Sequence, residues 1–235
     1  MRDLLVVVPT RGRPANAIRL LEAVVSTSTE KTDVIFGLDD DDETKDTLRA
    51  RIKLVGCSSG HQRDAMVEVG PRKGMAAWTN RLVMPRINDY RAFASLGDDH
   101  LPRTPGWDKI LLDANGGTGI SYGDDLIMGE RLPTAPVISQ NIIAALGWMC
   151  APGLDHMCCD NIWKDVGMAA GCLFYCPEVI IEHLHWVAGK AIVDETYKEA
   201  GIFSLAHPDW RAYQEWRGTR MTHDIEVVRE LTRGG

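Results

Sequence analysis

Hydrophobic residues gather in short uninterrupted runs, which alternate with stretches where hydrophobic residues recur at helical spacing. The first runs are LLVVVP at 4–9, VIFGL at 34–38 and RAFASL at 91–96. Continuous apolar runs of this length are typical of strands buried on both faces of a sheet. Between the first two runs, Ile18 and Leu21 fall on one face of a helical stretch. The alternation predicts an α/β fold with a mostly parallel central sheet flanked by helices.

The rest of the chain continues this alternation. Met75, Trp78 and Leu82 fall at helical spacing and form a predicted core face. We expect one domain over 1–200, with a helical C-terminal extension over 201–235 packed on it. Further strands are predicted at 51–56 and 119–125, with one or two over 172–186, and further helices at 106–115, 139–148, 158–167 and from 209 onward.

Composition and charge narrow the class of protein. The chain has 235 residues, of which 45% are hydrophobic and 25% charged, as is ordinary for a folded globular domain. With a net charge of −7, the chain lacks the excess of basic residues that non-specific nucleic-acid binding requires. The apolar run near the N-terminus is too short for a signal sequence, and no other run reaches the ~20 residues that span a bilayer. We expect a cytoplasmic protein with no membrane span.

Cysteine usage favours buried thiols over a disulfide framework. The chain has six cysteines, and its size makes disulfide staples unnecessary for stability. The segment HMCC at 156–159 offers metal-binding side chains, but the sequence contains no C-x2-C pair of the kind found in zinc sites. We therefore expect the cysteines to be buried in the core as free thiols.

The most informative polar cluster follows the run at 91–96, where Asp98, Asp99 and His100 stand in a row. Adjacent carboxylates repel each other unless a proton or a cation lies between them. The carboxyl ends of parallel strands are also where α/β sheets bind ligands. Oxygen ligands with one imidazole suit Mg²⁺ or Mn²⁺, and an ion held by few protein groups completes its shell with water and substrate phosphates. The cluster therefore predicts a divalent metal and a diphosphate.

Other motifs limit and extend this site. The first strand-to-helix turn, PTRGRP, has neither the G-x-G-x-x-G nor the G-K-[ST] pattern, which disfavours a dinucleotide-binding or P-loop enzyme. Four acids, 39–42, end the second strand, and we expect Asp40 to Asp42 to form a solvated loop that caps a helix. Strand alternation places His183 and His185 on the same side, as a metal ligand and its support.

Six segments, taken in order, resemble the GT-A nucleotide-sugar glycosyltransferases, particularly the family 2-like group. They are VVVPTRGRP, FGLDDDDE, RKGMAAWTNRL, LGDDH, HMCCDNIW and IEHLHW, and together they cover roughly 4–200. The resemblance implies a GT-A domain over 1–200 that uses Mn²⁺ or Mg²⁺. It also implies transfer of a hexose or pentose from a nucleoside-diphosphate sugar to an acceptor hydroxyl on a glycan, a protein or a modified DNA base.

The resemblance also implies roles for particular residues. Since the acidic motif ends in His100 where the family has a third acid, either Asp99 or His100 is the ligand at that point. We expect His185 to reach the metal or the diphosphate, and His183 to matter less. The expected metal ligands are Asp99, His100, His185 and His183, and the expected donor-binding residues are Thr10, Arg11, Arg13, Asp39, Lys73, Asn80, Asp98 and Lys190.

On the acceptor side, we expect Asp160 to be the general base of an inverting displacement, with Asp155 in reserve. A helix N-terminus at Asp160 is expected to lower the pKa of its carboxyl and keep it ionised.

Two other functions stay open. A sugar-phosphate nucleotidyltransferase would use the same acids to hold Mg²⁺ but normally needs a glycine-rich first loop. A non-catalytic nucleotide-sugar-binding module would have no need of a base.

Overall fold

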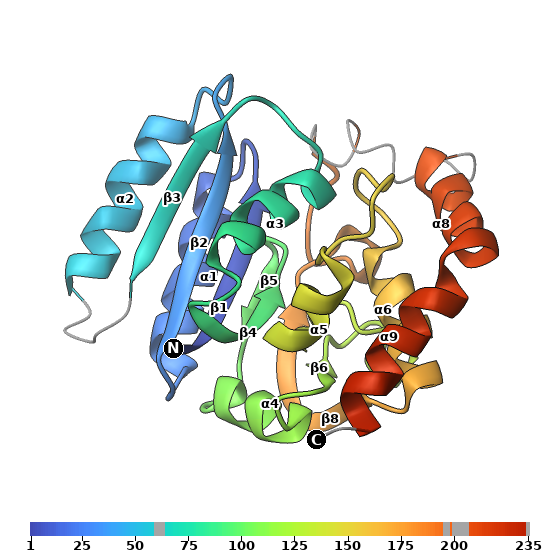
Figure 1. Ribbon diagram of the computed structural model, residues 1–235. Helices are drawn as coiled ribbons and strands as arrows, with labels where there is room; N and C mark the ends of the chain where they lie inside the picture. Colours follow the sequence, from blue (N-terminus) through green and yellow to red (C-terminus); the bar gives the residue numbers. More distant parts are fainter. Residues whose placement is uncertain (59–63, 195–197, 199–206, 234–235) are drawn as a thin grey trace.

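The computed structural model describes residues 1–58, 64–194, 198 and 207–233. Their eight strands form one sheet in the order β3-β2-β1-β4-β7-β6-β8-β5. Figure 1 shows this sheet running through the centre of the molecule. The strands are β1 (Arg2–Thr10), β2 (Thr32–Asp39), β3 (Ala65–Gly70), β4 (Tyr90–Ser95), β5 (His100–Pro102), β6 (Ile120–Asp124), β7 (Val137–Ser139) and β8 (Leu173–His183).

The sheet has a parallel half and a mixed half. β1 pairs in parallel with β2 and β4, and β2 pairs in parallel with β3. Beyond β4 the direction changes, because β7 runs antiparallel to both β4 and β6. β8 is parallel to β6, and the short β5 closes the edge antiparallel to β8. The fold is therefore α/β with a mostly parallel sheet, as predicted.

Helices cover both faces of the sheet, and alternate residues of β1 enter two separate cores. Leu4 and Val6 pack with α1, α2 and α4, whereas Leu5 and Val7 pack with α3, α5, α6, α8 and α9. The predicted core face at 75–82 is confirmed, since Trp78 is buried there. The helices are α1 (Pro14–Thr27), α2 (Lys45–Ser58), α3 (Met75–Val83), α4 (Trp107–Asn115), α5 (Gln140–Leu146), α6 (Cys159–Ala170), α8 (Pro208–Thr219) and α9 (Met221–Arg233).

Some sequence predictions of single elements are wrong. The strand predicted at 51–56 lies inside α2, because Leu48 and Ile52 are one helical turn apart and both enter the core. The third parallel strand is instead β3, and β5 and β7 were also not predicted. These strands were missed because β3 has only partly buried positions before Gly70, and β5 and β7 span only three residues each.

Residues 207–233 form two helices, α8 and α9. α8 and α9 pack beside α6 and α5 on the side of the molecule away from β3, in red in Figure 1. The predicted boundary at 200/201 lies outside the described residues. None of the helices within 1–58, 64–194 and 207–233 is long and apolar enough to cross a lipid bilayer. The expectation of buried free thiols holds for Cys150, Cys158, Cys172 and Cys176.

A buried carboxylate at the start of α4 anchors the loop that leads into β2. Asp108 is fully buried and accepts hydrogen bonds from the backbone N–H groups of Thr29 and Glu30 and from the Thr32 hydroxyl, at 2.7–3.1 Å. Removing it leaves these donors without their acceptor. We expect Asp108→Ala to lower the free energy of unfolding by about 2–4 kcal/mol in urea denaturation.

A matched control lies on the same helix. Asp113 forms an exposed pair with Lys109 at 2.7 Å, and such surface pairs contribute little to stability. Asp113→Ala should leave the urea midpoint almost unchanged. Equal midpoints for the two variants would contradict the anchoring role of Asp108.

Candidate active site

A cavity of about 790 Å³ opens where the carboxyl ends of β1, β2 and β4 face the C-terminal half of the chain. Parallel neighbours end at the same edge of a sheet, so the polar residues that follow them meet there. The predicted residues that line it are Thr10, Arg11, Arg13, Asp39, Lys73, Asp98, Asp99, His100, Asp155, Asp160, His183 and His185.

Asp98 lies at the junction of β1 and β4. Its carboxylate accepts a hydrogen bond from the Thr10 hydroxyl at 2.5 Å and lies 3.4 Å from Nη1 of Arg13. Burial and the neighbouring Asp99 raise the pKa of Asp98 to about 6, against the opposing effect of Arg13 and Thr10. The first loop and the acidic motif are therefore coupled through one buried carboxylate.

Asp99, His100 and His183 form the one group of potential metal ligands found among the described residues. One ligand atom from each lies within 4.8 Å of the others. The antiparallel pairing of β5 with β8 sets His100 directly opposite His183, and their rings stack at 4.0 Å. Asp99 Oδ1 lies 3.5 Å from His100 Nδ1 and 3.5 Å from His183 Nε2. Residues far apart in the sequence thus converge through a strand pairing.

The two imidazoles of this group have opposite electrostatic environments. Burial alone would lower the pKa of His183, but the nearby carboxylates of Asp125 and Asp99 raise it to about 9. Burial and the charge of His183 lower the pKa of His100 to about 3, so His100 is neutral. A cation between Asp99 and the rings would take the place of the His183 proton.

The residues present fit a divalent ion. His100 Nδ1 accepts a hydrogen bond from the Gly97 N–H at 3.1 Å, whereas Nε2 is buried and has no hydrogen-bond partner among the described residues. Because Nδ1 accepts in the neutral ring, Nε2 carries the proton, and the lone pair that this ring could offer to a cation is that of Nδ1, 3.5 Å from Asp99 Oδ1. One carboxylate with two imidazoles suits Mn²⁺ better than Mg²⁺, because Mg²⁺ prefers oxygen ligands.

The geometry of the late histidines favours His183 over His185 as a metal ligand, whereas the sequence led us to expect the opposite order. His185 lies just beyond β8 and outside the potential ligand group. Its Nδ1 accepts a hydrogen bond from the Val187 N–H at 3.3 Å, and its ring lies 4.8 Å from that of His183. His183 Nε2 lies 3.5 Å from Asp99 Oδ1, which makes His183 the better placed of the two rings to share a cation with that carboxylate.

Asp39 organises the opposite end of the cavity. Its buried carboxylate accepts hydrogen bonds from Trp78 Nε1 at 2.7 Å and from the Lys73 N–H at 3.1 Å. Its second oxygen contacts Arg11 at 3.1 Å, and Arg11 also binds Asp41 at 2.5 Å. Asp39 therefore holds two cationic residues at the cavity.

The expectation of a solvated loop at Asp40 to Asp42 is correct only in part. Asp40 and Asp41 are exposed, whereas Asp42 is buried. Asp42 accepts hydrogen bonds from the Gly12 N–H at 2.9 Å and from the Thr44 N–H at 2.8 Å. It therefore ties the first loop to the start of α2 in addition to capping that turn.

Two expected donor-binding residues do not line the cavity. The side-chain amide of Asn80 donates to the Cys150 carbonyl at 2.7 Å and accepts from the Met149 N–H at 2.8 Å, so it anchors the loop before α6. Lys190 pairs with Glu182 at 2.7 Å. Both side chains are held by the protein itself.

The two expected acceptor-side acids occupy one wall of the cavity. Asp160 lies in the first turn of α6, where its Oδ1 accepts a hydrogen bond from the Asn161 N–H at 2.9 Å. Burial raises the pKa of Asp160, so the expected lowering by the helix terminus is wrong. Asp155 is exposed and lies against Gly74, where a Cβ would come within 1.7 Å of its Oδ1. A Cβ at 74 would also come within 2.8 Å of the Asp155 carbonyl oxygen, so this position favours glycine.

Sequence reasoning missed Asp125, which supports His183 from the side opposite Asp99. Its Oδ1 accepts three backbone hydrogen bonds, from residues 127–129, at 2.6–3.0 Å. Its Oδ2 lies 3.8 Å from His183 Nδ1. Burial would raise the pKa of Asp125, but His183 and the backbone N–H groups hold it well below its usual range. The signal available was a second acidic pair, at 124–125, at the end of a predicted strand.

Solved structures share this architecture. The sequence matches no protein-family model and no curated protein. A mannosyltransferase from Pyrobaculum calidifontis, in complex with GDP-Man and Mn²⁺, matches with a TM-score of 0.59 at 10% identity, over 100% of this chain and 76% of that one. S. aureus TarS in complex with UDP matches with a TM-score of 0.58 at 9% identity, over 84% of this chain and 69% of that one. The chain has a GT-A fold.

Mn²⁺ binding at the Asp99, His100 and His183 group should depend on His183 more than on His185. We expect His183→Ala to weaken Mn²⁺ binding at least about tenfold in calorimetry, because it removes a group in contact with Asp99. His185→Ala is the matched control and should bind Mn²⁺ within about threefold of wild type. A larger loss in the His185 variant than in the His183 variant would restore the order expected from the sequence.

Proposed function

We propose that the protein is a metal-dependent glycosyltransferase that moves a hexose or pentose from a nucleoside-diphosphate sugar to an acceptor hydroxyl. The observation that carries this proposal is the Asp99, His100 and His183 group beside the cationic first loop. Support comes from the GT-A fold, whose solved examples include a mannosyltransferase with GDP-Man and Mn²⁺ and TarS with UDP-GlcNAc. We assign the catalytic domain to 1–200 and the extension to 201–235.

On the donor side, the chain offers positive charge where a diphosphate would need it. Arg13 lies 3.9 Å from Asp99, and Arg11 and Lys73 line the same cavity beside Asp39. Mn²⁺ or Mg²⁺ held there would stabilise the negative charge that develops on the departing diphosphate. Thr10 and Asp98 lie at the base of this region, where we assign them to hydroxyls of the ribose or of the sugar.

On the acceptor side, Asp160 is the proposed general base, with Asp155 in reserve. Its raised pKa makes its carboxylate a stronger proton acceptor than an ordinary aspartate. It comes from α6, a different element from the strands that carry the metal group. A base and a leaving group on different walls suit an in-line displacement with inversion.

The donor half of the reaction can be tested without knowing the acceptor. A panel of UDP-, GDP- and other nucleotide sugars, scored by free nucleoside diphosphate, should contain at least one that is hydrolysed slowly with Mn²⁺. Chelation with EDTA should abolish that release, because the leaving diphosphate then lacks its counter-charge. Release that is unchanged in EDTA would rule out the metal-dependent mechanism.

The base can be tested separately from the donor site. Asp160→Asn should bind Mn²⁺ and nucleoside diphosphate normally, yet transfer sugar at least about a hundredfold more slowly. Asp155→Asn is the comparison variant. If Asp155→Asn is inactive while Asp160→Asn turns over normally, the two roles exchange, and if both variants are active the inverting mechanism is wrong.

A further inference from the structure

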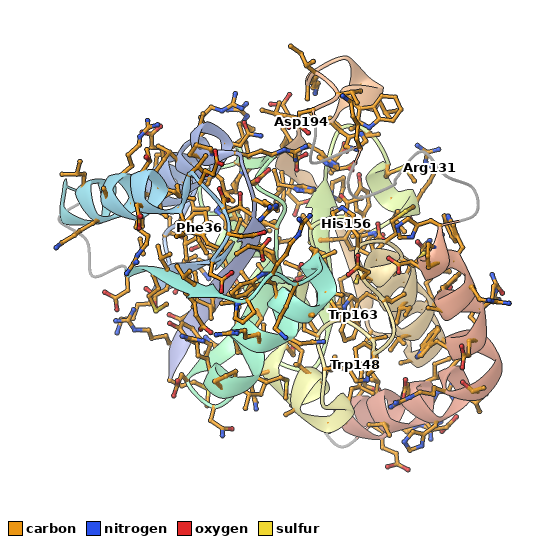
Figure 2. All side chains as sticks on the ribbon, turned by 90° about the horizontal axis from the view of Figure 1, so that it is seen from above. Phe36, Arg131, Trp148, His156, Trp163 and Asp194 are labelled. Atoms are coloured by element: carbon orange, nitrogen blue, oxygen red, sulfur yellow. The ribbon has the colours of Figure 1, made fainter. Side chains whose placement is uncertain are left out.

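The C-terminal helix α8 helps to build the cavity wall that faces the donor side. Asp209, 1% exposed, accepts hydrogen bonds from three consecutive backbone N–H groups, those of Asp155 at 2.9 Å, His156 at 2.7 Å and Met157 at 2.5 Å. Figure 2 shows His156 between the N-terminal strands and the C-terminal helices. One carboxylate of α8 thus fixes the loop that carries Asp155 and leads to Asp160.

The next residue of α8 presents an aromatic surface to the same cavity. Trp210 is 37% exposed and lines the cavity. Its ring meets Tyr213 edge-on, with centroids 6.4 Å apart, and Asp209 holds the start of the helix in place. An indole that is exposed inside a cavity and held from behind is suited to packing against the flat apolar face of a ligand.

The segments that line the cavity differ in the charge of their side chains. The lysine and arginine residues of the lining all precede α3 in the chain. Among the described lining residues from 128 to 210 there is no lysine or arginine. These residues instead offer the carboxylates of Asp155 and Asp160 and the amide of Asn161, while burial lowers the pKa of His156 and keeps it neutral. The cationic residues that line the cavity are Arg11, Arg13, Arg72 and Lys73.

We infer that the acceptor is an uncharged saccharide, which packs a ring face on Trp210 and offers its hydroxyls to Asp155, Asp160 and Asn161. This inference rests on the proposed function. Carboxylates and amides are strong acceptors for sugar hydroxyls, and the C–H face of a sugar ring is apolar. In the reaction, Asp160 takes the hydroxyl proton, the hydroxyl oxygen bonds to the anomeric carbon, and the nucleoside diphosphate leaves with the electron pair of the broken bond.

The same observations disfavour a nucleic-acid acceptor. A nucleobase would also stack on an indole, but nucleic-acid sites combine stacking with cationic groups along the phosphate backbone. The described lining residues from 128 to 210, which include Trp210, contain two acids, Asp155 and Asp160, and no lysine or arginine. Oligonucleotides and peptides therefore enter as competing outcomes of the test.

The test compares three classes of acceptor on the full-length protein with the donor that shows Mn²⁺-dependent hydrolysis. Methyl glycosides of glucose, mannose, galactose and N-acetylglucosamine, a single-stranded oligonucleotide and a Ser/Thr peptide are each added at millimolar concentration. We expect only a methyl glycoside to stimulate nucleoside-diphosphate release. Trp210→Ala should raise the KM for that glycoside about tenfold or more, and Trp210→Phe should recover part of the loss.

Phe174→Ala is the matched control, since Phe174 is 40% exposed and does not line the cavity. It should leave stimulation and KM unchanged. Binding is followed independently as the change in intrinsic fluorescence on adding the methyl glycoside, which should shrink in Trp210→Phe. This readout decides the matter even if Trp210→Ala folds poorly.

Stimulation by the oligonucleotide or the peptide would overturn the inference. So would a panel in which no glycoside acts, or a Trp210→Ala variant with the wild-type KM. Failure of the proposed function has a different signature, because no nucleotide sugar would then be hydrolysed with Mn²⁺ before any acceptor is added.

Discussion

The contact between Asp99 and His183, at 3.5 Å, is the interaction on which the site depends. It joins the end of the parallel half of the sheet to the last strand of the mixed half. Asp98, Asp99 and Asp125 are all buried near it, and like charges in such surroundings require compensation. The protein supplies part of this through Arg13 and the charged His183 ring. A divalent ion held by Asp99, His100 and His183 would supply the same compensation, at the point where a diphosphate would also need it.

Strand pairing explains how this contact arises. The parallel order of β1, β2 and β4 brings the first loop, Asp39 and Asp98 to one edge of the sheet. The antiparallel pairing of β5 with β8 then places His183 opposite His100, beside these residues. Finally, Asp209 binds the loop at 155–157 and completes the far wall. The C-terminal helices therefore belong to the site as well as to the core.

The sequence predicts the parallel half of this arrangement well, because its signals are local. Uninterrupted apolar runs mark β1, β2 and β4, and acids at the ends of β2 and β4 mark the ligand edge. Local sequence signals do not predict which residues are brought together by the pairing of distant strands. A three-residue strand such as β5 has no periodicity, so nothing in the chain indicated that His183, rather than His185, would meet Asp99.

Asp209 and Asp160 show a second limit of sequence reasoning. An acid in the first turn of a helix looks like an ordinary terminal charge, and only the packing of α8 shows that Asp209 serves a distant loop. At Asp160 the helix terminus and burial act in opposite directions on the pKa, and burial prevails. Burial depends on the whole fold, so the sign of that shift could not be obtained from the local sequence.

The most direct measurement is the affinity for nucleoside diphosphates with and without a divalent ion. Calorimetric titration of UDP and GDP should give binding of at least one of them in Mn²⁺ that is at least about tenfold weaker in EDTA. In Asp99→Ala the difference between Mn²⁺ and EDTA should disappear. Equal affinity of the wild-type protein in Mn²⁺ and in EDTA would contradict the metal-centred account of the site.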